Sequence, residues 1–60
     1  MGQDTEFFIE AEAKALADFG YKVTPNDVKV SLDFIIAGNE PRTIVERFIK
    51  RHWDKYQEDK

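Results

Sequence analysis

Apolar residues in the last third of the chain recur with the period of a helix. At 100° per residue, the segment Glu40 to Tyr56 places His52 on one side together with the apolar residues Ile44, Val45, Phe48, Ile49, Trp53 and Tyr56. This arc covers about half of the circumference, more than the stripe of roughly 100° that is typical of a surface helix. We therefore predict a helix over residues 40–57 that is covered by neighbouring helices or by another molecule.

A second helical pattern occupies residues 5–19. One face carries Phe8, Ile9, Ala11, Ala15, Leu16 and Phe19. Asp4 or Thr5 can cap its start, and Gly20 is placed to end it in the left-handed conformation. Residues 1–4 are expected to fray. Phe7 points away from the apolar face, whereas Glu12 lies within it.

Residues 25–37 fit two patterns. Their apolar residues alternate as in a strand, but Val28, Leu32, Ile35 and Ile36 also form a helical face. The preceding Thr24-Pro25-Asn26-Asp27 is typical of a helix start, because Thr24 is a good N-cap and Asp27 stands where a capping box has its acid. This cap favours a helix, and a hairpin turning at residues 25–27 is the alternative.

The fold class that follows is all-α, a small three-helix bundle in one domain, residues 1–60. The helices are expected near residues 5–19, 25–37 and 40–57, with Asn39 as the cap of the third. With 60 residues, 42% of them hydrophobic and none of them cysteine, stability has to come from helix packing without disulfides.

Charge is distributed unevenly over this small acidic protein. The net charge is −3, but residues 1–20 hold five acidic residues against Lys14, and residues 41–60 hold six basic residues against four acidic ones. No apolar run approaches the roughly 18 residues of a membrane span, and no basic, apolar leader begins the chain. We expect a cytoplasmic protein without a membrane partner.

Catalytic chemistry finds little support in the sequence. His52 is the only histidine, Ser31 is the only serine and lacks a nucleophile-elbow context, and the three glycines form no phosphate-binding loop. His52 and Asp54 face different sides of a helix, so they do not make a metal site. We expect neither an enzyme nor a cofactor, a metal or a small-molecule substrate.

The segment Leu16–Tyr21 (LADFGY) places a hydrophobe, a glycine and an aromatic residue after the first predicted helix, Thr24 opens the second helix, and Ser31–Leu32 and Gly38–Asn39 follow. These segments resemble the corresponding parts of ubiquitin-associated domains, which are three-helix modules that dock on other proteins. The resemblance covers most of residues 9–49, although Phe19 replaces the customary methionine and the second helix runs about two residues longer. It implies a docking surface that includes Phe19, Gly20, Tyr21 and the end of the third helix.

The segment Glu40–Arg51 is also similar to the recognition helix of helix-turn-helix DNA-binding domains, with Gly38 at the place of the turn glycine. The resemblance implies that Arg42, Thr43 and Arg47 reach base edges, while Lys50 and Arg51 contact phosphates. The sequence departs from the pattern at two positions: Asn39 replaces the usual hydrophobic residue of the turn, and Arg47 falls where a core residue is expected. A net charge of −3 also does not favour binding to a polyanion such as DNA.

We therefore expect a non-catalytic module that binds another protein, with self-association as a homodimer through Val30 and Phe34 as one form of this binding. The expected protein-binding residues are Phe7, Phe19, Gly20, Tyr21, Val30 and Phe34. The alternative is a helix-turn-helix DNA-binding or transcription-regulatory protein that uses Arg42, Thr43, Arg47, Lys50 and Arg51. Salt distinguishes the two, because binding to phosphates weakens steeply as salt rises.

Overall fold

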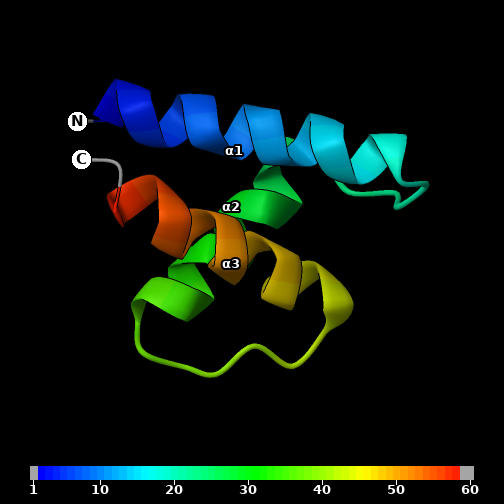
Figure 1. Ribbon diagram of the computed structural model, residues 1–60. Coiled ribbons are helices and arrows are strands. Elements are labelled where there is room, and N and C mark those ends of the chain that lie inside the picture. Colours follow the sequence, from blue (N-terminus) through cyan, green and yellow to red (C-terminus); the bar gives the residue numbers. More distant parts are fainter. Residues whose placement is uncertain (1, 59–60) are drawn as a thin grey trace. The chain divides into compact units, whose positions relative to one another are not determined.

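The structure, a computed structural model, describes residues 2–58, with side chains from Thr5 onward. It contains three helices, α1 (Gly2–Asp18), α2 (Pro25–Ile36) and α3 (Ile44–Glu58), and residues 2–58 form no strand (Figure 1). The predicted fold class, a small all-α three-helix bundle, is confirmed. Residues 25–36 are a helix, so the alternative hairpin is wrong.

Contacts within the chain group into two units, Met1–Val30 and Ser31–Lys60, and the boundary falls inside α2. The first unit contains α1 and the first half of α2. The second contains the rest of α2 and α3. The single domain over residues 1–60 stays a prediction.

In the first unit, the buried apolar residues are Phe8, Ile9, Ala13, Leu16 and Val28. Glu12, which lies within the apolar face of α1, is also buried. Phe7 is 75% exposed, which agrees with its place off that face. The prediction was wrong for Phe19, which is 71% exposed because α1 ends at Asp18 and the chain turns before Phe19 could continue the helical face.

The turn after α1 has the hydrogen bonds of a Schellman motif. The Tyr21 N–H donates to the Leu16 carbonyl (3.0 Å) and the Gly20 N–H donates to the Ala17 carbonyl (2.9 Å). Gly20 takes a φ of 97°, the left-handed conformation that only glycine adopts without strain. The predicted role of Gly20 is confirmed, whereas α1 begins at Gly2 instead of near Thr5.

The start of α2 is the predicted capping box. The Asp27 N–H donates to Thr24 Oγ1 (3.1 Å), and the Thr24 N–H donates to Asp27 Oδ2 (3.0 Å). Two N–H groups at the helix start therefore gain partners. Pro25 follows the cap directly, and its fixed φ suits the first position of a helix. Neighbouring residues of the sequence therefore set the direction in which α2 begins.

In the second unit, the buried apolar residues are Leu32, Ile35 and Ile49. The broad apolar side of α3 is covered only in part: Val45, Phe48, His52, Trp53 and Tyr56 are half-buried. Ile44, at the start of α3, is 62% exposed.

The third helix begins four residues later than predicted. Thr43, not Asn39, caps it, because the Glu46 N–H donates to Thr43 Oγ1 (3.0 Å). Asn39 closes α2 instead, where its side-chain Nδ2 donates to the Phe34 carbonyl (3.0 Å). Gly38 at φ 97° completes a second Schellman motif, since the Gly38 N–H donates to the Ile35 carbonyl and the Asn39 N–H to the Phe34 carbonyl.

Candidate functional site

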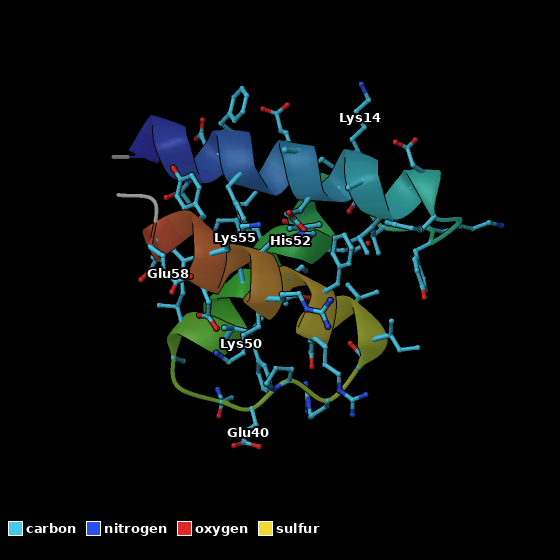
Figure 2. The ribbon with its side chains drawn as sticks, in the orientation of Figure 1. Lys14, Glu40, Lys50, His52, Lys55 and Glu58 are labelled. Atoms are coloured by element: carbon cyan, nitrogen blue, oxygen red, sulfur yellow. The ribbon has the colours of Figure 1, made fainter. Side chains whose placement is uncertain are left out.

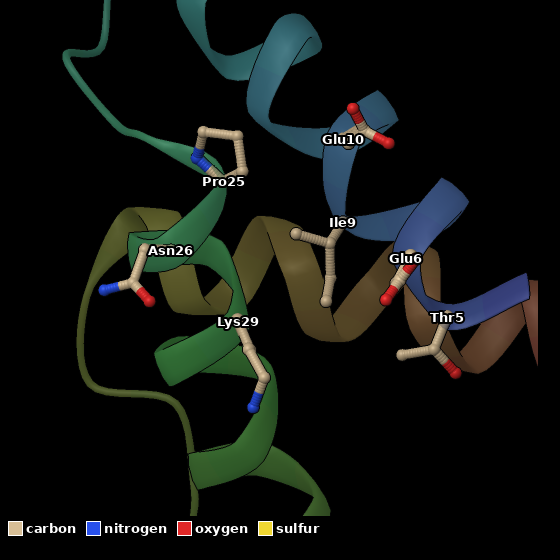
Figure 3. Close-up of a pocket in the computed structure, with 7 residues that line it drawn as sticks. All are labelled: Thr5, Glu6, Ile9, Glu10, Pro25, Asn26 and Lys29. Atoms are coloured by element: carbon tan, nitrogen blue, oxygen red, sulfur yellow. The ribbon is translucent and has the colours of Figure 1, made fainter. Parts of the chain in front are cut away.

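The first unit contains an open groove between α1 and the start of α2 (Figure 3). Its volume is about 630 Å³, within the range of ligand-binding clefts. The α1 wall consists of Thr5, Glu6, Ile9 and Glu10, and the α2 wall consists of Pro25, Asn26 and Lys29. The groove lies wholly within the unit Met1–Val30.

Helical spacing brings the α1 residues of the groove to one side. Glu6 and Glu10 are four residues apart, so they lie about one turn apart along α1. On α2, Lys29 follows Pro25 by four residues and therefore stands one turn below it. The capping box of Thr24 and Asp27 fixes the turn that presents the α2 wall.

The groove has an apolar centre and charged walls. Ile9 is 93% buried and projects from α1 toward α2, with Pro25 on the opposite wall (Figure 3). Glu6 and Glu10 are exposed carboxylates on the α1 wall, and Lys29 places an ammonium group on the α2 wall. A partner that fills this groove therefore needs an apolar group for the centre and a cation for the α1 side.

The residues predicted to bind protein lie outside this groove. Phe7, Phe19, Val30 and Tyr21 are all exposed, by 75%, 71%, 61% and 39%. Phe19, Gly20 and Tyr21 form one continuous exposed turn. Their role in docking, implied by the resemblance to ubiquitin-associated domains, stays a prediction. Single exposed apolar side chains are common on protein surfaces, so their exposure alone does not define a site.

Phe34, also predicted to bind protein, is half-buried. The guanidinium carbon of Arg42 lies 4.1 Å from the centre of its ring, a cation–π contact. This contact covers the ring from within its own chain. Phe34 is therefore less accessible to a second copy than its position on α2 suggests.

The residues predicted to bind DNA differ in the contacts that they make within the chain. Arg42 and Thr43 belong to the start of α3, where the Arg42 N–H donates to Glu46 Oε1 (2.7 Å) and Thr43 caps the helix. Lys50 projects from α3 (Figure 2). Its ammonium lies 2.8 Å from the carboxylate of Asp54, one turn further along the helix. Arg47 and Arg51 are exposed beside Ile44 and Phe48, with which they line a shallow hollow of about 260 Å³.

The Glu46 carboxyl, near the start of α3, has a lowered pKa. The hydrogen bond from the Arg42 backbone N–H is the largest cause that lowers its pKa below the ordinary value of 4.5. Burial opposes this effect, and the Arg42 guanidinium, 3.5 Å from Oε2, and the Thr43 N–H reinforce it. The carboxylate is therefore held charged although the residue is 92% buried.

Metal and membrane chemistry find no structural support in the described part of the chain. Residues 5–58 bring together no group of three histidine or acidic side chains that could hold a metal ion. None of the helices, as far as residues 2–58 define them, has both the length and the apolar content needed to cross a bilayer.

Two features of the structure, the groove and the cap of α3, were not predicted from the sequence. The groove draws its walls from two helices, so no local pattern marks it. The cap of α3 did leave a signal, because Thr43-Ile44-Val45-Glu46 has the spacing of a capping box just before an apolar periodic run.

Comparison of the chain with protein-family models, with curated proteins and with solved structures found no match.

Proposed function

We propose that this chain is a non-catalytic protein-binding module that holds a basic amphipathic segment of its partner in the groove between α1 and α2. The observation that carries the proposal is the groove itself, with Ile9 and Pro25 at its apolar centre and two exposed carboxylates on one wall. An apolar centre supplies affinity, and complementary charges around it supply orientation and selectivity.

The chemistry of the walls supports a cationic partner. Glu6 and Glu10 project from the same side of α1, so a segment with two cations one turn apart can reach both. An acidic segment would meet these carboxylates at close range and be repelled. A basic helix with an apolar stripe satisfies the centre and the α1 wall together.

DNA binding through α3 is the second proposal, carried by the exposed guanidinium groups of Arg47 and Arg51. It is the weaker one, because Arg42 and Thr43 already serve the cap of α3 and Lys50 already pairs with Asp54. A duplex would have to displace these contacts or bind through the two remaining arginines alone.

The test is an amide-shift titration of the isotope-labelled full chain with two synthetic helical peptides. One peptide repeats leucine with lysine, and the other has the same leucines with glutamate in place of lysine. We expect the lysine peptide, but not the glutamate peptide, to cause saturable shifts, because the negative charge on the α1 wall selects a cationic partner. The shifts should appear at Glu6, Ile9, Glu10, Asn26 and Lys29.

Matched variants locate the binding. Glu6→Lys with Glu10→Lys should weaken binding of the lysine peptide by roughly tenfold or more. Asp18→Lys makes the same kind of charge change on α1 away from the groove and should leave the affinity within about twofold, the range left by screening at this distance. Equal binding of both peptides would contradict the proposal, as would shifts confined to residues 19–21.

A mixed-sequence DNA duplex, added at low salt in a separate titration, tests the second proposal. Shifts from Arg42 to Arg51 that disappear as salt is added would favour DNA binding. Spectra that do not change on addition of DNA would contradict the second proposal.

A further inference from the structure

The exposed side of α3 combines apolar and basic groups in a compact pattern. Ile44 and Phe48 are four residues apart, and so are Arg47 and Arg51. Each pair is therefore separated by about one turn, roughly 6 Å along the axis. Ile44 is 62% exposed, so its side chain is available to a partner.

This pattern complements the α1 wall of the groove in the first unit. Glu6 and Glu10 on the α1 wall have the same one-turn separation as Arg47 and Arg51 on α3. Two ion pairs can thus form in register when the helices run side by side. The apolar side chains of α3 lie beside its arginines, just as Ile9 lies beside the two carboxylates.

We infer that the groove of one chain receives the Ile44–Arg51 face of α3 from a second copy of the same chain. The inference rests on the proposed function and names its partner. The two surfaces differ from each other, so the contact is made twice in a two-fold dimer or repeats from copy to copy. This contact differs from self-association through Val30 and Phe34, since neither residue lines either surface.

The test is a charge exchange between the two surfaces, followed by sedimentation equilibrium of the full chain. At low salt, the average molar mass of the unsubstituted chain should rise with protein concentration. It should fall again as salt is added. One variant carries Glu6→Lys and Glu10→Lys, and the other carries Arg47→Glu and Arg51→Glu. Each alone should associate at least about tenfold more weakly than the unsubstituted chain, because like charges then face each other.

An equimolar mixture of the two variants should associate again, because both of its contacts join opposite charges. The basic groove of the first variant faces the acidic α3 of the second, and the unchanged α3 of the first faces the unchanged groove of the second. Asp18→Lys, a single charge reversal on α1 outside the groove, is the control and should associate like the unsubstituted chain. Circular dichroism of each variant checks that the helices persist. The neutral pair Glu6→Gln with Glu10→Gln removes the attraction without adding repulsion, so it should weaken self-association by less than the lysine pair does.

The outcomes separate this inference from the proposed function. A chain that stays monomeric at every concentration overturns self-association, and so does a mixture that does not recover. If that chain still binds the lysine peptide in the groove, protein binding stands and the second copy is excluded as its partner. The variant with Arg47→Glu and Arg51→Glu keeps its groove, so its failure to bind the peptide would overturn the proposed function itself.

Discussion

The starts of α2 and α3 have the same four-residue layout, a threonine followed three residues later by an acid, in two different settings. At α2, Thr24 and Asp27 exchange their hydrogen bonds at the surface, and both residues are exposed. At α3, Glu46 is buried and accepts N–H groups from both Thr43 and Arg42. The comparison shows that one local motif can serve only its own helix or can also anchor the loop before it.

The largest expected effect is the removal of the buried acid. Glu46→Ala leaves the Arg42 and Thr43 N–H groups without their charged acceptor, and we expect it to lower the free energy of unfolding by about 3 kcal/mol. Asp27→Ala removes the equivalent acid from the exposed box and should cost about 1 kcal/mol. Chemical denaturation of both variants measures the difference, and equal losses would show that burial adds nothing to the motif.

The second test uses acid. Because the folded pKa of Glu46 is lowered, its contribution to stability is complete above the ordinary value of 4.5 and is lost as the pH falls through the folded value. Protein carrying Glu46→Gln should therefore lose less stability than the unsubstituted chain between neutral and acidic pH. Denaturation midpoints at several pH values check this, and parallel losses in the two proteins would contradict it.

The C-terminal ends of α1 and α2, unlike the two helix starts, have the same geometry. Gly20 and Gly38 both have φ 97°, and a Cβ built on either would have no atom within 4 Å. Gly20→Ala and Gly38→Ala should each cost about 1 kcal/mol, purely from the left-handed backbone. Replacement by D-alanine in a synthetic chain should instead stabilise by about 0.5 kcal/mol, because only the unfolded chain loses freedom. A loss with D-alanine would show that crowding matters.

Local signals account for the part of the fold that the sequence predicted. Gly20 and the box at Thr24 depend on residues within four positions of each other, and both are confirmed. The start of α3 was misplaced because Asn39 is a good cap for either helix end. Its side chain bonds to the carbonyl of Phe34, in the last turn of α2, where carbonyls have no N–H partner within the helix.

The candidate site was less accessible to sequence reasoning, because a groove is a property of packing. Hydrophobicity points to Phe7 and Phe19, which are exposed but do not line the groove between α1 and α2. Ile9 reads as an ordinary core residue, and Glu6 and Glu10 read as an ordinary polar face. Only the placement of α1 beside the start of α2, within one unit, shows that these residues share a cavity with Pro25.

The aromatic pair on α3 has a spectroscopic consequence. Trp53 is the only tryptophan, and its ring stacks on that of Tyr56 with centroids 5.5 Å apart. Its fluorescence therefore reports on the unit Ser31–Lys60, whereas far-ultraviolet circular dichroism follows all three helices. If both signals change at the same denaturant concentration, the chain unfolds as one cooperative domain, and if they separate, the two units melt independently.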